Sequence, residues 1–387
     1  MKPKLHILPI IILSQFACTS LWFAGNAIVG ELAQKTGLGT EIIGYVLSSV
    51  QFGFIMGTLV FALLMIADRF SPSKVFLICA FLAAFCNSVL LSERISSAML
   101  ISIRFGTGFF LAGIYPVGMK IAADYYEKGL GKALGFLIGA LVLGAAFPYF
   151  IAGITWGANY LTVIKTTSAF AISGGLLLWV FVPNGPYRKP STRLRLRSGP
   201  ALFKVSGFRK AAFGYFGHMW ELYAFWAFVP IALETFNSVQ KTTLSISIWT
   251  AVIIAIGGVS SILGGYGSLR MGSKKVALIS LIISGLLCLV SPFLFQLPSF
   301  FFLFLWCLWG MAVVSDSAQF SSMAAIAVPD TLKGTALTLM NCIGFAISIL
   351  SIQLLSYLIE KIDATLLFLV LGIGPIFGSL SLLKKSS

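Results

Sequence analysis

Twelve apolar stretches of roughly 18 to 30 residues, separated by short polar breaks, run along this 387-residue chain. A helix needs about 20 apolar residues to cross a bilayer, so each stretch is a candidate membrane span. The stretches are continuous, unlike the alternating segments of a membrane β-barrel, so helices must satisfy the backbone hydrogen bonds. Only 10% of the residues are charged, against about 25% in soluble domains. The sequence therefore predicts an all-α integral membrane protein embedded in the lipid bilayer. The predicted spans are 8–30, 42–67, 75–92, 97–122, 131–155, 163–182, 210–236, 243–269, 276–296, 298–327, 333–358 and 364–383.

The basic residues indicate topology. The formal net charge is +15, which could suggest nucleic-acid binding. Twenty of the 27 basic residues, however, fall at the termini and in even-numbered loops, five fall in odd-numbered loops, and Arg104 and Lys120 lie within the fourth span. By the positive-inside rule we expect both termini to lie in the cytoplasm. We therefore attribute the basic excess to topology and expect no nucleic-acid partner. We expect a multi-pass protein of a bacterial inner membrane. The apolar run near the N-terminus is too long for a signal peptide, so we interpret it as the first span.

A polar segment divides the chain into halves that resemble each other. Residues 183–208 are rich in Pro, Gly, Ser and Arg, which predicts a basic cytoplasmic linker between six-helix bundles at 1–182 and 209–387. The halves repeat at an offset of 201 to 203 residues: "ADRFSPSK" after the second span matches "SLRMGSKK" after the eighth. Such duplication is typical of secondary transporters, whose binding sites lie near the bilayer midplane between the repeats.

The first copy of this loop carries a recognisable motif, Gly-x-x-x-Asp-Arg-x-Gly-Arg-Lys, which occurs between helices two and three of the major facilitator superfamily. Asp68, Arg69 and Lys74 stand in comparable places, while Leu64 and Ser71 replace the two glycines. On this motif and its repeat, the chain resembles that superfamily across nearly its whole length.

The second copy of the motif is also incomplete. Gly265, Arg270, Gly272 and Lys274 match the pattern, whereas Leu269 replaces the acidic residue. We expect the loop residues Asp68, Arg69, Lys74, Arg270 and Lys274 to act as a gate, although simple anchoring of the helices is the alternative.

Two further motifs support the resemblance to different degrees. "RFGTGFFLAG" supplies Arg104, Gly108 and Gly113 of the family's helix-four pattern. The antiporter signature Gly-x-x-x-Gly-Pro is half present in "GFLIGA" at 135–140, where Ala replaces Pro. The resemblance implies two pseudo-symmetric six-helix bundles, with helices one, four, seven and ten facing a cavity.

Charged side chains inside the fourth span require shelter, because an Arg or Lys at a helix centre costs roughly 2.5 to 3.5 kcal/mol. Arg104 can bind a carboxylate bidentately, or bond to helix backbone, or extend toward the interface. Lys120 can belong to an anion route, or pair with Asp124 one helical turn away.

His218 and Glu221 are three residues apart in the seventh span and share one helix face. An imidazole changes charge near neutral pH, so the two together form a candidate proton-coupling pair. A metal site is the weaker alternative, because two ligands without a third are insufficient. The remaining alternative is that the two side chains only form structural hydrogen bonds.

Asp316 in the tenth span lies in a polar patch with Ser315, Ser317 and Gln319. It can pair with Lys120 or Arg104 across the bundle, or bind the substrate directly. Aromatic and amide side chains complete the candidate lining, each of which can equally be a packing or interfacial residue. They are Trp22, Asn26, Tyr115, Tyr223, Trp226 and Gln319.

These features favour a transporter over an enzyme. No nucleotide-binding loop of the Gly-x-x-x-x-Gly-Lys type occurs, so a gradient is the expected energy source. The six cysteines lie inside spans without metal-ligand spacing, and we expect neither a cofactor nor a metal. The resemblance implies a monomer that binds a small-molecule substrate and moves it by alternating access.

The sequence therefore predicts proton-coupled transport of a small polar or anionic solute, such as a carboxylate metabolite or a carboxylate siderophore. Efflux of amphipathic compounds by proton antiport is the first alternative, suggested by 14% aromatic residues. A transporter-like sensor or scaffold is the second, although it would need a signalling domain or docking tail.

Overall fold

The computed structural model describes residues 5–36, 42–92, 95–126, 130–154, 160–188 and 194–384, and these residues form helices without strands. Twelve helical stretches are long and apolar enough to cross a membrane, which confirms the predicted number. The seventh is longer than expected, because its helix continues to both sides of the apolar run. The spans are Ile7–Ala27, Gly44–Leu63, Pro72–Leu91, Ser97–Tyr125, Ala133–Ile154, Tyr160–Phe181, Ser206–Gln240, Ile246–Met271, Ser273–Leu294, Ser299–Ile326, Asp330–Leu358 and Ala364–Leu383.

The chain divides into two compact units, Met1–Ser191 and Thr192–Ser387, here called the N-terminal and C-terminal units. The N-terminal unit holds spans one to six. Its elements are α1 Ile7–Thr19, α2 Leu21–Ala27, α3 Val29–Thr36, α4 Ile42–Leu63, α5 Ile66–Arg69, α6 Pro72–Ser88, η1 Val89–Leu91, α7 Ser97–Leu111, α8 Tyr115–Tyr125, α9 Leu130–Ile154 and α10 Tyr160–Phe181.

The C-terminal unit holds spans seven to twelve, preceded by two short helical turns. Its elements are η2 Leu196–Ser198, α11 Gly199–Leu202, α12 Ser206–Gln240, α13 Ile246–Met271, α14 Ser273–Leu294, α15 Ser299–Ser315, α16 Ser317–Ile326, α17 Asp330–Leu358, η3 Ala364–Gly372 and α18 Ile373–Leu383.

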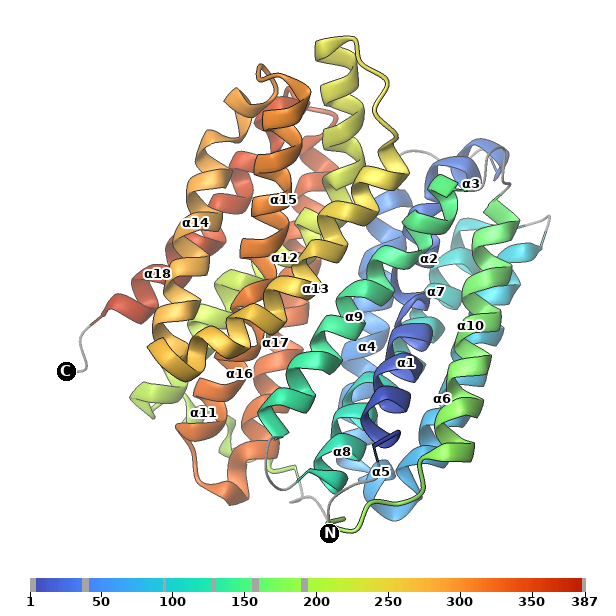
Figure 1. Ribbon diagram of the computed structural model, residues 1–387, viewed down its shortest axis with the longest axis vertical. Helices are drawn as coiled ribbons and strands as arrows, with labels where there is room; N and C mark the ends of the chain where they lie inside the picture. The colour runs from blue at the N-terminus through green and yellow to red at the C-terminus, as the bar shows by residue number, and fades with distance from the viewer. Residues whose placement is uncertain are drawn as a thin grey trace. The chain divides into compact units, whose positions relative to one another are not determined.

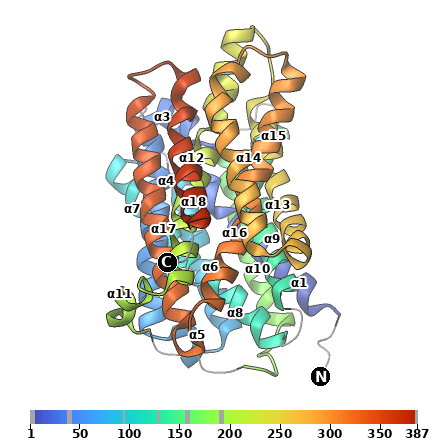
Figure 2. The same cartoon turned by 90° about the vertical axis from the view of Figure 1, so that its left-hand side faces the viewer.

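Both units use the same helix pairings, as expected for a repeat. In the N-terminal unit α4 packs on α7, α6 on α10, and α1 lies between α9 and α10 (Figure 1). In the C-terminal unit α13 packs on α15, α14 on η3 and α18, and α12 packs on α17 and α18 (Figure 2). Each pairing in the N-terminal unit therefore has a counterpart between the equivalent spans of the C-terminal unit.

Glycines allow the closest of these pairings. A side-chain carbon on Gly108 of α7 would overlap the Val50 carbonyl oxygen of α4. One on Gly310 of α15 would overlap the Ile253 carbonyl oxygen of α13 in the same way. These glycines are 202 residues apart, so the repeat preserves the small residues that let membrane helices approach closely.

Spans four and ten are both interrupted at equivalent places. The fourth breaks between α7 and α8, and the tenth breaks at Asp316 between α15 and α16. Tyr115 and Ser317, which begin the second half of each span, are again 202 residues apart. Broken spans expose helix ends inside a bundle, where polar groups can be bound.

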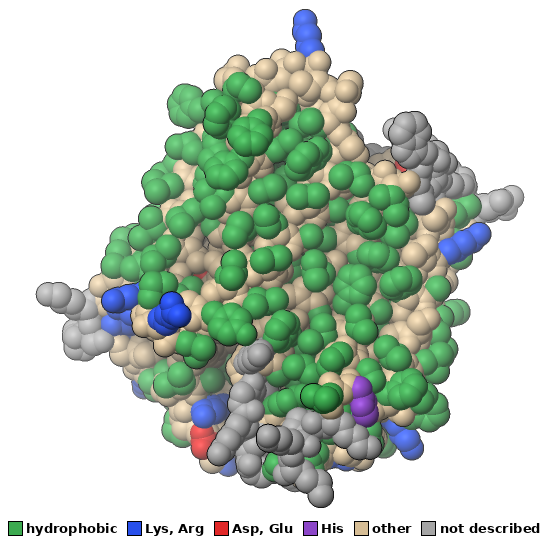
Figure 3. Space-filling model, in the orientation of Figure 1, with side chains coloured by type: hydrophobic (Ala, Val, Ile, Leu, Met, Phe, Trp, Pro, Cys, Tyr) green, Lys and Arg blue, Asp and Glu red, His purple; other side chains and the backbone are tan. Residues whose placement is uncertain are grey.

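The outer faces of the helices are apolar. Figure 3 shows hydrophobic side chains covering most of one face of the molecule. Large aromatic side chains are among the most exposed, with Phe85, Phe293 and Phe300 at 69%, 73% and 72%. A surface of this kind fits hydrocarbon rather than water, so the protein is an integral multi-pass membrane protein.

Candidate functional site

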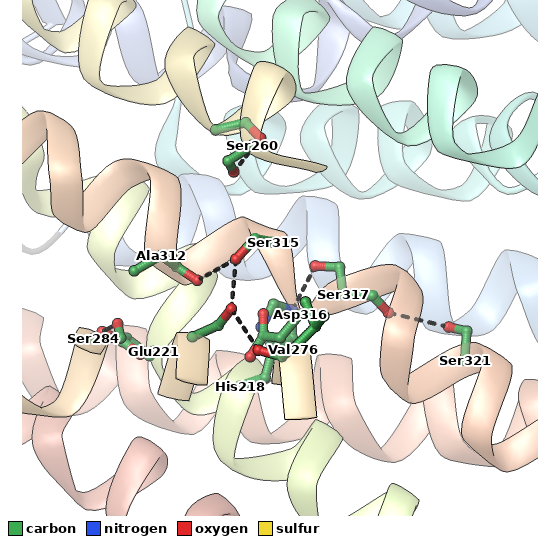
Figure 4. A network of polar contacts seen from close by, with 12 residues as sticks. His218, Glu221, Ser260, Val276, Ser284, Ala312, Ser315, Asp316, Ser317 and Ser321 are labelled. Carbon is green, nitrogen blue, oxygen red and sulfur yellow. Dashed lines mark hydrogen bonds and ion pairs between the residues drawn. The ribbon is translucent and has the colours of Figure 1, made fainter. Parts of the chain in front are cut away.

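A buried ion pair joins two of the charged residues in the C-terminal unit. His218 Nδ1 of α12 lies 2.8 Å from Asp316 Oδ1, and both side chains are 1% exposed. The other ring nitrogen, Nε2, lies 2.9 Å from the Ser317 hydroxyl (Figure 4). Sequence reasoning offered Lys120 or Arg104 as a partner for Asp316; within the C-terminal unit its ion-pair partner is the imidazole on α12.

The break in span ten presents Asp316 to His218. Asp316 precedes α16, and its backbone carbonyl accepts hydrogen bonds from the Gln319 and Phe320 amides. A carboxylate is favoured at this helix end, because the first amides of a helix carry partial positive charge.

The contact between Nδ1 and Oδ1 has the distance of an ion pair but not the angles of a hydrogen bond. It is attractive when Nδ1 carries a proton, since a bare nitrogen lone pair would face the carboxylate oxygen. The contact therefore joins α12 to the start of α16.

Glu221, one turn from His218 on α12, has different partners. Its Oε1 accepts hydrogen bonds from the Ser284 hydroxyl, from Trp309 Nε1 at 2.6 Å and from the Cys288 thiol at 3.3 Å. The side chain is 1% exposed. Within the described ranges, no basic side chain lies within ion-pair distance of it, so neutral donors alone surround this carboxyl group.

Further serines on α13, α14 and α15 extend the polar region. The hydroxyls of Ser280 on α14 and Ser315 on α15 are 2.6 Å apart, and Ser260 on α13 donates to the Met311 carbonyl at 2.7 Å. Figure 4 shows Ser315 and Ser317 near His218 and Asp316, with Glu221 and Ser284 to one side and Ser260 farther away. The C-terminal unit therefore holds a polar layer within an apolar bundle.

Arg104 in the N-terminal unit is fully buried and bonds to backbone. Its Nη2 donates to the Trp22 carbonyl at 2.6 Å, and both terminal nitrogens donate to the Leu21 carbonyl at 3.3 Å. Gly25 makes room for it, because a side chain there would come within 2.7 Å of Nε. Arg104 thus ties α7 to the start of α2, just after the break in span one.

Lys120, on α8 of the same unit, contacts the loop that follows span two. Its Nζ lies 2.9 Å from Asp68 Oδ1, and the two side chains are 16% and 12% exposed. Arg188, after span six, donates to the carbonyls of Asp68 and Phe70 at 2.8 Å each. The segment after span six, helix α8 of span four and the loop motif are therefore bound together.

The second loop motif is built differently. Arg270 and Lys274 are exposed, as are Arg69 and Lys74 of the first copy. Within the described residues, neither Arg270 nor Lys274 forms an ion pair, and Leu269, in the acidic position, is 81% exposed. The ionic contact is confined to the first copy because the second lacks a carboxylate.

The candidate lining residues are mostly buried. Trp22, Asn26, Tyr223, Trp226 and Gln319 are at most 7% exposed, and Tyr115 is half-buried. The rings of Tyr223 and Trp226 are in edge contact at 5.5 Å. Both polar atoms of the Asn26 amide are buried and lack a hydrogen-bond partner among the described residues.

Several polar residues of the site escaped sequence reasoning. Ser284 and Trp309 contact Glu221 from helices far along the chain, so spacing alone could not identify them. Gln15 and Gln51 are fully buried amides whose polar atoms have no partner in the part of the chain described. A lone amide in an apolar run was the signal for both. No group of three metal-ligating side chains occurs among the described residues.

Comparison with known proteins agrees with this architecture. The family model of the Major Facilitator Superfamily matches residues 10–210. No curated protein sequence matches the chain.

Solved structures of transporters share the fold. The human organic anion transporter MFSD10 (TETRAN) superposes with a TM-score of 0.73 at 14% identity, covering 99% of this chain and 100% of that one. A mutant of the nucleoside transporter NupG gives 0.72 at 16% identity with 97% and 98% coverage. The proton:xylose symporter XylE gives 0.70 at 13% identity with 97% and 95% coverage. With its twelve spans, its repeated helix pairings and this family match, the chain belongs to the major facilitator superfamily of membrane transporters.

Proposed function

We propose that this protein is a proton-coupled secondary transporter that moves a small polar solute by alternating access between its two six-helix units. The observation that carries the proposal is the His218–Asp316 ion pair, buried within membrane spans of the C-terminal unit. Ionisable side chains in such positions are costly and typically mark ion or substrate pathways. Both termini lie in the cytoplasm in this proposal, as the distribution of basic residues favours.

The pair provides a mechanism for coupling. While His218 is protonated and Asp316 is ionised, their attraction holds α12 against the start of α16. Without that proton a neutral imidazole faces a carboxylate, and the attraction disappears. Proton binding thereby biases the packing of span seven on span ten, two of the spans that the family resemblance places at the cavity.

The solute in this proposal is neutral and polar rather than anionic. The anionic expectation depended on Arg104 and Lys120, and both contact groups of their own unit. The Asn26 and Gln319 amides, which both donate and accept, suit hydroxyl-bearing or amide-bearing solutes. The fold alone does not identify the class of solute, because the similar structures are those of organic anion, nucleoside and xylose transporters.

Transport into proteoliposomes tests the proposal. Flux of a solute selected by thermal shift should rise when an inward proton gradient is imposed. His218→Gln should abolish this dependence on the gradient, whereas His6→Gln should leave it intact, because His6 is exposed near the N-terminus. Full gradient-driven uptake by His218→Gln would refute the coupling role.

Export of amphipathic compounds is the second candidate. The rings of Tyr223 and Phe345 lie 5.3 Å apart next to Trp226, an aromatic group that can pack against flat apolar solutes. The same vesicles decide between the two: proton-driven accumulation of dyes but not of polar metabolites would favour export by antiport.

A further inference from the structure

We propose that Glu221 is a second proton-binding site, separate from the His218–Asp316 pair, so that each transport cycle carries two protons. This inference rests on the proposed proton-coupled transport and specifies its stoichiometry. It starts from an asymmetry at the carboxyl group: three donors converge on Oε1, while no described residue donates to Oε2.

The partners of Glu221 do not neutralise a charge. A serine hydroxyl, an indole N–H and a thiol each stabilise the carboxylate through hydrogen bonds, but all three are neutral. Removal from water disfavours the same carboxylate. These effects oppose each other, so the charged and the protonated forms are both accessible to this side chain, as a site that loads and releases a proton requires.

A metal cation fits this environment poorly. Trp309 presents only an N–H donor, at 2.6 Å from Oε1, and a cation at that oxygen would meet its hydrogen. Hard cations require several oxygen ligands. Within the described chain, no cluster of metal-ligating side chains surrounds the site.

The two sites have separate partners although both lie on α12. His218 contacts Asp316 and Ser317 at the break in span ten, whereas Glu221 contacts α14 and α15. Ser284, one turn from Ser280 on α14, donates to Glu221, while Ser280 contacts Ser315 instead.

Few other titratable groups surround Glu221. Asp316, at the start of α16, acts on it electrostatically, and the Cys288 thiol faces it from α14. Among the described residues, α13, α17, η3 and α18 present no charged side chain to it.

Charge balance requires two protons. With one proton on His218 and one on Glu221, the imidazolium and the Asp316 carboxylate cancel, and the layer is neutral. With both released, two carboxylates remain in an apolar bundle, which is unfavourable unless the layer meets water. In each cycle Glu221 Oε2 gains a hydrogen from one side of the membrane, and that O–H bond breaks to the other side.

The proton-to-solute ratio tests this inference. Vesicles containing a pH-sensitive dye and a labelled solute should report about two protons per solute for the unchanged protein. Glu221→Gln keeps a neutral acceptor at Oε1 but cannot gain a proton, so the number of protons carried per solute should fall to about one. Glu234→Gln is the matched control, because Glu234 is an exposed carboxyl group on the same helix, and its ratio should stay at two.

The outcomes separate the two proposals. A ratio of one in the unchanged protein, with transport still driven by the proton gradient, would overturn the second site and leave proton coupling intact. No proton movement with solute would overturn both. The measurement on the unchanged protein needs no variant, so poor folding of Glu221→Gln cannot obscure the result.

Discussion

The buried charged side chains of this protein are accommodated in three different ways. Arg104 bonds to backbone carbonyls, His218 and Asp316 pair with each other, and Glu221 accepts neutral donors. Only the last two arrangements change when a proton is gained or lost. These differences support the proposal that Arg104 has a positioning role and that the C-terminal unit binds protons.

Arg104→Lys tests this assignment. A lysine keeps the charge but cannot reach the Leu21 and Trp22 carbonyls with a planar fork. Each hydrogen bond lost from a charged group costs about 1.5 to 3 kcal/mol, so thermal unfolding of the purified protein should occur several degrees lower. The proton-to-solute ratio should be unchanged. Arg197→Lys, at an exposed position, should unfold like the parent. Lost solute binding with unaltered unfolding would instead make Arg104 a ligand.

Sequence reasoning found the charged residues but not their partners. Helical spacing predicted His218 and Glu221 on one face of span seven and suggested that they act as a pair. Their actual partners come from spans nine and ten, 63 to 99 residues away. Spacing fixes neighbours within one helix only, because contacts between helices depend on packing that a single sequence does not encode locally.

At the scale of helices, close packing depends on glycine at particular points rather than on glycine in general. Gly310 lies against the backbone of α13, whereas a side-chain carbon on Gly265 would meet nothing within 4 Å. The first contributes to helix association and the second only to helix flexibility.

The variants Gly310→Ala and Gly265→Ala should therefore change the stability of the protein in opposite directions. The added methyl of Gly310→Ala would overlap the Ile253 carbonyl, and such overpacking costs about 1 to 3 kcal/mol. Gly265→Ala should be neutral or stabilising by up to about 1 kcal/mol, because alanine favours helix. Thermal unfolding in detergent measures both, and equal destabilisation would show that the close approach of α13 and α15 is unimportant.

Hydropathy predicted the spans well and their interruptions poorly. Length and apolar character fix where a helix can cross, so the twelve spans were accessible from sequence. The breaks near Ser20 and at Asp316 carry no proline, whereas α12 contains Pro230 and continues through it. A break depends on which neighbouring groups satisfy the freed backbone, and these come from other helices.

For the whole molecule, the repeat preserves helix pairing but not chemistry. The same spans pack in each unit, yet the titratable pair lies in the C-terminal unit and the ionic loop contact in the N-terminal one. The offset of 201 to 203 residues predicted the shared architecture. The chemical asymmetry followed from single substitutions, such as Leu269 in the place that corresponds to Asp68.

Because the ionic loop contact exists in one copy only, neutralising the two copies should have unequal effects on the transport cycle. Asp68→Asn removes the attraction between the Asp68 carboxylate and Lys120 Nζ, which lie 2.9 Å apart in a partly buried ion pair. An ion pair of this kind contributes about 1 kcal/mol to the conformation in which it forms. Its loss would therefore change the population ratio of the two conformations of the transport cycle roughly fivefold. The affinity for the solute should change little. The labelling rate of an introduced cysteine, which reports how accessible that position is, should shift with the ratio of the conformations.

Arg270→Gln is the comparison within the same molecule. Arg270 is exposed and forms no ion pair with a described residue, so labelling should match the parent. Arg188→Ala should reproduce part of the Asp68→Asn shift, since Arg188 holds the same loop through its carbonyls. If Asp68→Asn left both labelling and transport unchanged, the loop would be an anchor. An equal shift from Arg270→Gln would instead assign the gate to the charge of both loops.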